Sequence, residues 1–115
     1  MPLIKITSSV EVPADKREAF LAAVSKTMSA ATGKPERVMM VVLDAGSVML
    51  DTKSGPGAYA DVRAIGGLTP EVNAKITAQV CALLKQWLSI PGERVYLTFT
   101  EVAATNWGHN GKTFG

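Results

Sequence analysis

Hydrophobic residues along the chain follow two different periods, and these periods alternate. An apolar run from Leu3 to Thr7 is typical of a short strand. Four apolar residues then recur at the spacing of one helix face: Phe20, Val24, Met28 and Ala31. A second apolar run, Val38 to Leu43, comes next. The first part of the chain therefore predicts the order strand, helix, strand.

Boundary residues support the first helix. Asp15 with Glu18 three residues later is a capping-box pattern, and Pro13 stands just upstream. Gly33 is the residue type that ends a helix in a left-handed conformation. We therefore expect a helix that begins near Asp15 and stops at Gly33.

The second part of the chain predicts the same order again. Thr69 and Pro70 are a typical N-cap and first helical residue, and Pro91 lies past the expected helix end. Five residues form the apolar face of this helix: Ile76, Val80, Leu83, Leu84 and Trp87. A strand from Val95 to Thr100 follows. Between the halves, Ser47 to Leu50 predicts a short extra strand, and Lys53 to Gly57 predicts a turn or loop.

A repeated tripeptide suggests a duplication. Glu36-Arg37-Val38 recurs as Glu93-Arg94-Val95, 57 residues later (93 − 36). With this offset, the strand Leu3 to Thr7 corresponds to Ala60 to Ala64, and the helix near Asp15 to one near Val72. Each half therefore reads as a strand-helix-strand unit.

Two such units predict an α+β fold, a four-stranded sheet with both helices on one face. The right-handed crossover rule makes the strands of each unit parallel. Val41 and Val42, like Tyr96 and Leu97, put apolar side chains on both sheet faces. The face without helices then needs a cover, and a second copy of the chain is the economical one. We expect a homo-oligomer.

Composition narrows the class of protein. A length of 115 residues with 47% hydrophobic residues predicts a single domain, 1–115. A net charge of +2, with Lys and Arg scattered singly, argues against nucleic acid as a partner. No apolar stretch approaches a membrane span, and no secretory leader is evident. We expect a cytoplasmic protein, or one exported without a signal peptide.

Pro2 is the first candidate for chemistry. It follows Met1 and directly precedes the first strand, and a small second residue favours removal of Met1. Removal would leave a secondary amine, and such amines titrate near neutral pH, as proton-transfer catalysis requires. If Met1 stays attached, the nitrogen of Pro2 is a tertiary amide without basicity. An ordinary second residue is the alternative interpretation.

Short motifs occur in a fixed order along the whole chain. They are Met1-Pro2, Ala31-Thr32-Gly33-Lys34-Pro35, Ile65-Gly66, Arg94-Val95-Tyr96, Asn106 with Gly108, and Asn110-Gly111-Lys112-Thr113-Phe114. Together they resemble the macrophage migration inhibitory factor family within the tautomerase superfamily.

The resemblance implies a trimer whose sheets line a central barrel, with active sites at the subunit interfaces. It implies a keto–enol tautomerase for phenylpyruvate-type substrates, with Pro2 as the base and neither cofactor nor metal ion. Lys34 matches the lysine that binds the substrate carboxylate, and the backbone of Ile65 matches a hydrogen-bonding group beside it. Tyr96 matches an aromatic residue from the neighbouring subunit. By position alone, Lys34 could instead be a solvated lysine after a helix, and Tyr96 a core aromatic residue.

The chain departs from the family around this site. Thr98 stands where the vertebrate cytokine has an asparagine, which shortens the reach of a hydrogen-bonding group. Val38 replaces a tyrosine at the pocket rim, and Arg63 replaces a histidine near Ile65. The resemblance puts three residues on the pocket wall: Trp107, His109 and Phe114. His109 could equally be an exposed tail residue, and Arg63 could either favour acidic substrates or face solvent.

Two further functions compete with the tautomerase hypothesis. One is a signalling or interaction protein in which tautomerase activity is weak or vestigial, with an unknown protein receptor as partner. The other is an isomerase or dehalogenase for a different unsaturated acid. A thiol–disulfide mechanism is not expected, because Gly57 and Ala60 replace both cysteines of the family dithiol and only Cys81 remains.

Overall fold

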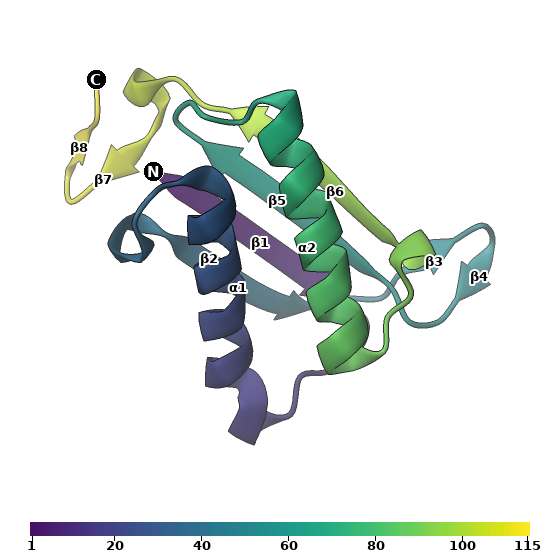
Figure 1. Ribbon diagram of the computed structural model, residues 1–115. Coiled ribbons are helices and arrows are strands. Elements are labelled where there is room, and N and C mark those ends of the chain that lie inside the picture. The colour runs from purple at the N-terminus through teal and green to yellow at the C-terminus, as the bar shows by residue number, and fades with distance from the viewer.

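A four-stranded sheet lies at the centre of the computed structural model, which describes all residues, 1–115. The strand order is β2-β1-β5-β6. Their bounds are β1 Pro2–Ser8, β2 Met40–Ala45, β5 Ala58–Ala64 and β6 Val95–Glu101. Helices α1 (Arg17–Thr32) and α2 (Pro70–Leu88) lie side by side across one face of the sheet (Figure 1). This confirms the predicted α+β fold with two helices on one face.

Strand directions fix which segments meet at each end of the sheet. β1 is parallel to β2, β5 is parallel to β6, and the central pair β1 and β5 is antiparallel. Pro2 therefore lies opposite Ala64, and Ala64 lies opposite Glu101. The start of β1 and the ends of β5 and β6 share one edge of the molecule.

Two small hairpins extend from opposite ends of the sheet (Figure 1). One pairs β3 (Met49–Leu50) with β4 (Lys53–Ser54), and the other pairs β7 (Gly108–His109) with β8 (Lys112–Thr113). The extra strand predicted at Ser47 to Leu50 is present as β3 but covers only Met49–Leu50. The first two residues of the segment Lys53 to Gly57 form β4. Single 3-10 turns precede α1, β2, β6 and β7.

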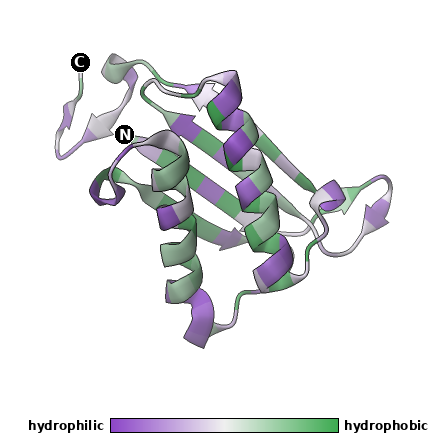
Figure 2. Cartoon of the chain, viewed as in Figure 1, coloured by the Kyte–Doolittle hydropathy of each residue, from purple (hydrophilic) through white to green (hydrophobic).

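The core fills the space between the helices and the sheet. Alternate strand residues, such as Ile4, Ile6 and Val62, are fully buried and point toward the helices. Figure 2 shows the resulting alternation of apolar and polar residues along the strands. Phe20 of α1 meets Trp87 of α2 edge to face, with ring centroids 5.6 Å apart. Neither helix is long and apolar enough to cross a membrane.

The two halves repeat with an offset of 56 residues rather than 57. The buried residues Phe20, Val24 and Met28 of α1 correspond to Ile76, Val80 and Leu84 of α2 (76 − 20 = 56), as this aligned series shows. Both helices end with a left-handed residue, Gly33 and Ser89, at the same offset. A one-residue shift would place core residues on the wrong face of a strand. The repeated Glu-Arg-Val tripeptide is therefore one residue out of structural register.

Backbone hydrogen bonds follow the same offset. The amide of Ile65 donates to the Met1 carbonyl over 3.3 Å, and the amide of Ser9 donates to the Gly57 carbonyl over 3.0 Å. A second equivalent pair joins the strand ends. The Val102 amide donates to the Ala64 carbonyl over 2.8 Å, and the Gly46 amide donates to the Ser8 carbonyl over 3.1 Å. The halves are thus equivalent in their loops as well as in their strands and helices.

Helix and strand boundaries differ from the sequence prediction in the first half. A 3-10 turn, Ala14–Lys16, comes before α1, and no side chain caps the helix at Lys16. The capping box at Asp15 and Glu18 is therefore wrong. A second 3-10 turn, Glu36–Val38, delays β2 to Met40. In the second half, Thr69 caps α2 as predicted, since its Oγ1 accepts from the Val72 amide over 3.2 Å.

The open face of the sheet is more polar than predicted. Val42 and Tyr96 do lie there, but charged residues lie beside them. Lys5 pairs with Asp44 over 3.4 Å, and Arg63 pairs with Asp61 over 3.1 Å. Val41 and Leu97 pack instead against the core on the helix side. The open face therefore carries both apolar and charged residues, because successive side chains of a strand point to opposite faces of the sheet.

Candidate functional site

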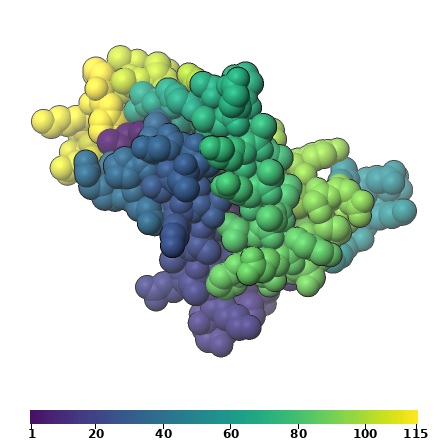
Figure 3. All heavy atoms as spheres, viewed as in Figure 1, coloured from purple at the N-terminus to yellow at the C-terminus, as the bar shows by residue number.

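Pro2 begins β1 and lies buried at the edge where the start of the chain meets the end of β5. Its register partner is Ala64, and the next residue, Ile65, binds the Met1 carbonyl through its amide. Figure 3 shows the purple start of the chain at the surface, between the yellow C-terminal tail and blue segments of the first half. Met1 is attached in this structure, so the nitrogen of Pro2 is here an amide.

Lys34 reaches this edge from the end of α1. Its Nζ donates to the carbonyl oxygen of Ile65 over 3.1 Å and to that of Gly66 over 2.7 Å. The ammonium can make three hydrogen bonds, so these two leave one for a ligand. Lys34 and the Ile65 backbone, both predicted as site groups, are therefore adjacent to each other and to the first residues of the chain.

Local backbone geometry places Lys34. Gly33 ends α1 with φ of 72°, a left-handed conformation that favours glycine. Ser29 Oγ then donates to the Lys34 carbonyl over 2.6 Å. Across from it, Gly67 has φ of +85°, and a Cβ there would lie 3.3 Å from Lys34 Cε and 3.4 Å from its Nζ. Gly67 thus leaves room for the lysine head.

The amine of Met1 shows the electrostatics of this edge. Burial, followed by the positive charge of Lys34, lowers the pKa of the Met1 amine below its ordinary value. Both effects disfavour the ammonium form. This edge of the molecule therefore disfavours positive charge on the Met1 amine.

The tail contributes an aromatic wall. Trp107 is half-buried and lines an open cavity of about 260 Å³ that also includes Leu3 and Arg63. Phe114 donates its amide to the Trp107 carbonyl over 3.1 Å, and its ring stacks on His109 with centroids 5.6 Å apart. Trp107 therefore lies beside the residue that follows Pro2, whereas His109 and Phe114 are exposed on the hairpin.

Tyr96 and Thr98 lie elsewhere in the same chain. Both are on the open face of β6, where Tyr96 is 64% exposed and Thr98 Oγ1 is 2.5 Å from Tyr59 Oη. Glu101, which is level with Pro2, is five residues beyond Tyr96, or about 16 Å along the strand. One chain does not bring Tyr96 or Thr98 to Pro2.

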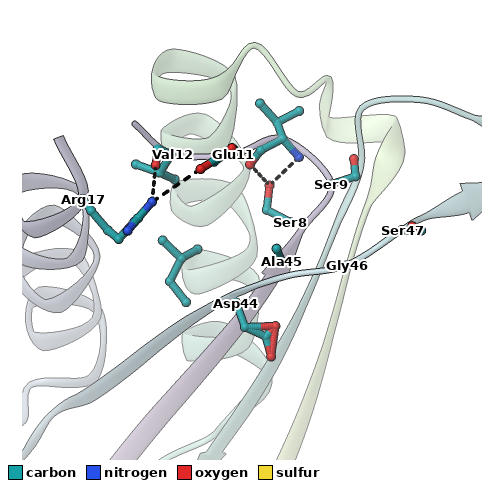
Figure 4. A pocket seen from close by; sticks show the side chains of 11 residues that line it. Ser8, Ser9, Glu11, Val12, Arg17, Asp44, Ala45, Gly46 and Ser47 are labelled. Carbon is teal, nitrogen blue, oxygen red and sulfur yellow. Dashed lines mark hydrogen bonds and ion pairs between the residues drawn. The ribbon is translucent and has the colours of Figure 1, made fainter. Parts of the chain in front are cut away.

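A larger open cavity, of about 570 Å³, lies at the far ends of β1 and β2 (Figure 4). Arg17 crosses its mouth, donating to the Val12 carbonyl over 3.0 Å and approaching Glu11 at 3.8 Å. Ser8 donates its hydroxyl to the carbonyl of Val10, another lining residue, over 2.7 Å. The cavity lining includes the carboxylates of Glu11 and Asp44 and the guanidinium of Arg17, but no lysine.

Three contributors were not identified from sequence. Ser29 and Gly67 position Lys34, and the consecutive glycines Gly66 and Gly67 were the available signal. Arg94 joins the β3–β4 hairpin to β6 by donating to three carbonyls, those of Leu50, Lys53 and Pro56.

Burial raises the pKa of the Cys81 thiol on α2, which reduces its thiolate fraction.

Comparison with known proteins places this geometry in a family. The model of the macrophage migration inhibitory factor (MIF) family matches residues 1–115. A macrophage migration inhibitory factor homolog from Trichuris trichiura is 30% identical over 99% of this chain and 100% of its own length.

Solved structures agree. The homologue from Prochlorococcus marinus is 34% identical with a TM-score of 0.92, covering 98% of this chain and 99% of its own. The MIF-like protein of Entamoeba histolytica is 27% identical with a TM-score of 0.93, covering 98% of each chain. Sequence, fold and full-length coverage agree, and the chain belongs to the macrophage migration inhibitory factor family.

Proposed function

We propose that this protein is a keto–enol tautomerase of phenylpyruvate-type acids, with the Pro2 amine as general base after removal of Met1. Family membership supports a tautomerase-like or MIF-like function at the coarser level. The observation that carries the finer proposal is the convergence of Lys34, the Ile65–Gly66 carbonyls and the start of β1 at one edge.

The proposed reaction needs one base and one cation. The Pro2 nitrogen accepts the proton from the enol oxygen and returns it to the adjacent carbon, which becomes sp³ as the carbonyl forms. Lys34 holds the substrate carboxylate and stabilises negative charge that develops on the oxygen. No electrons leave the substrate, so the reaction needs no redox partner. A strand within a four-stranded sheet holds Pro2 rigidly, as proton transfer requires.

The test is Pro2→Gly, after intact mass has shown that Met1 is absent from both proteins. We expect kcat/KM for phenylpyruvate to fall by at least about 10²-fold, the usual scale for loss of a general base. Pro13→Ala, an exposed proline before α1, is the matched control and should keep full activity. Full activity of Pro2→Gly would show that another group is the base.

A composite site is part of the proposal. Tyr96 and Thr98 are too far along β6 to meet Pro2 of their own chain, so we propose a homotrimer in which a neighbouring subunit supplies them. Sedimentation at micromolar concentration should then give one species of three times the 12.2 kDa chain mass. A stable monomer would contradict the shared site.

The second candidate function is a MIF-like signalling or interaction protein with an unidentified receptor. Thr98 in place of the family asparagine and Val38 in place of the rim tyrosine favour it, because both remove substrate contacts. Absence of phenylpyruvate turnover in verified Met1-free protein would support this function instead.

A further inference from the structure

The cavity beside the start of β1 has an unusual set of walls. Its volume is about 260 Å³, and it opens next to Leu3, the residue after Pro2. A guanidinium, an amide, an indole and aliphatic groups line it, and none of the lining residues carries a carboxylate side chain. The lining residues are Leu3, Arg63, Val102, Asn106, Trp107 and Gly108. A cation beside an aromatic wall is suited to a flat organic anion.

Arg63 is held in place by its own strand. It lies opposite Leu3 on the open face, and Asp61, two residues earlier, accepts from Nε over 3.2 Å and from Nη2 over 3.1 Å. This two-point contact with the Asp61 carboxylate fixes the plane of the guanidinium, and Nη1 of Arg63 makes no hydrogen bond within the chain. Asp61 therefore orients Arg63 while leaving donors free for a ligand.

Two cations thus lie on different sides of the chain start. Lys34 approaches from the helix layer and binds the Ile65 and Gly66 carbonyls. Arg63 projects from the opposite face of the sheet, beside Leu3. A molecule that reaches the Pro2 nitrogen with one carboxylate on Lys34 could place a second negative group near Arg63.

From this arrangement we infer that Arg63, with Trp107 and Asn106, forms a second anion subsite, so that the preferred substrate is a keto acid carrying an anionic group at both ends. The inference rests on the proposed tautomerase function for the role of Pro2 and Lys34. Trp107 packs against the body of the ligand, Asn106 donates from its amide, and Arg63 pairs with the distal carboxylate. Arg63 thereby determines specificity and takes no part in the proton transfer.

The experiment compares two ligands that differ by one group. Phenylpyruvate carries one carboxylate, and 4-carboxyphenylpyruvate carries a second one on the far side of the ring. Binding is measured by tryptophan fluorescence, with calorimetry as an independent readout, at fixed ionic strength. Trp107 lies at the cavity, whereas Trp87 packs against Phe20 in the helix layer, so a change on binding reports Trp107.

We expect the wild type to bind the dicarboxylate about tenfold more tightly, the scale of one accessible charge-assisted hydrogen-bonded pair. Arg63→Met should abolish this preference. The ratio of the two affinities is compared within each variant, because the freed Asp61 carboxylate also affects phenylpyruvate binding. Arg63→Lys should keep a smaller preference, because a point charge replaces the fork. Lys85→Met on α2, exposed and remote, lowers the net charge equally and should keep the full preference.

Equal affinity of the wild type for both acids would overturn the subsite. So would a preference that survives in Arg63→Met, or one that Lys85→Met also loses, because net charge would then explain it. Turnover of phenylpyruvate is measured separately on the same proteins. A wild type without turnover but with an Arg63-dependent preference would remove the tautomerase proposal and retain the anion subsite.

Discussion

Pro2 and Ala58 begin the two equivalent strands β1 and β5, 56 residues apart (58 − 2). Both lie buried on the helix side of the sheet, and both follow a residue whose carbonyl accepts an equivalent amide. The chain runs on through Ala58, so its nitrogen is an amide in every form of the protein. Only at Pro2 can processing expose a basic nitrogen.

The residues that follow the two helices also differ between the halves, since only the first half has a charged residue there. Lys34 follows Gly33 in the first half, and the residue at its equivalent position in the second half is Ile90 (34 + 56), which is fully buried. At that second end Ser9 Oγ donates to the Gly57 carbonyl over 3.1 Å and accepts its amide over 2.9 Å. Side chains of the protein itself satisfy the backbone groups there.

The scaffold is thus duplicated, whereas the groups proposed for chemistry are confined to the first half. Helix packing, strand pairing and loop hydrogen bonds recur in both halves, since they depend on periodicity and on backbone groups. The proposed proton transfer depends on the amine at the start of β1 and on Lys34, and both belong to the first half. The large cavity at the far ends of β1 and β2 (Figure 4) includes Ser9, the equivalent of Ile65, but neither Ala58 nor Ile90 lines it.

The largest effect should come from giving Pro2, at the start of β1, the amide nitrogen that Ala58 has at the start of β5. An alanine inserted between Met1 and Pro2 still allows removal of Met1, but leaves the nitrogen of Pro2 as an amide, as at Ala58. We expect tautomerase activity to fall by about 10²- to 10⁴-fold, the range for loss of a general base. Steady-state kinetics on mass-verified protein is the measurement, and unchanged sedimentation controls for folding. Retained activity would exclude the Pro2 nitrogen as the base.

A smaller loss should follow when the cation is removed. Lys34→Ile reproduces the residue found at position 90, and Lys34→Met keeps the length of the side chain. We expect kcat/KM for phenylpyruvate to fall by about 10- to 100-fold, as for a lost hydrogen bond to a charged group. The separate determination of KM and kcat checks the role, because carboxylate binding predicts a raised KM. An unchanged KM in both variants would contradict it.

The same variants should also shift the pH dependence. The positive charge of Lys34 helps to lower the pKa of the Met1 amine. We expect it to act in the same way on the Pro2 amine, so that its removal raises the pKa of Pro2. The base acts when neutral, and activity is lost as the pH falls through its pKa. The acid limb of the kcat/KM profile should therefore move to higher pH in Lys34→Met. A limb that stays in place would show that Lys34 does not influence the amine.

Sequence reasoning succeeded where periodicity decides the structure. The helix faces that contain Val24 and Val80, and the Thr69 cap, followed from spacing and residue type. The offset of the repeat did not, because the matching Glu-Arg-Val tripeptides outweighed the burial pattern. In the structure Glu36–Val38 is one 3-10 turn, whereas its equivalent is Gly92–Arg94, so identical residues occupy shifted positions.

The site was predictable in part for a different reason. Lys34 and Ile65 came from family motifs, and their contact lies within one chain. Asp61 and Arg63 share a face of β5 because they are two residues apart, but the spacing alone did not show that their side chains pair. Tyr96 and Thr98 do not meet Pro2 within one chain, and in the proposed trimer a neighbouring subunit would supply them. Local patterns thus predict elements, and contacts between distant or separate segments require the fold.

The smallest effect concerns the two helix starts. Thr69 caps α2 through its side chain, but α1 begins after a 3-10 turn at Lys16, where no side chain accepts from the helix. We expect Thr69→Ala to lower the free energy of unfolding by about 1 kcal/mol, the usual value of an N-cap. Lys16→Ala should change it by less than about 0.5 kcal/mol, as for exposed sites without a special role. Urea unfolding at matched protein concentration measures both, since subunit association would contribute to stability. Equal losses in the two variants would mean that Lys16 stabilises α1 through a contact other than a cap, and that the two helix starts are more alike than their hydrogen bonds indicate.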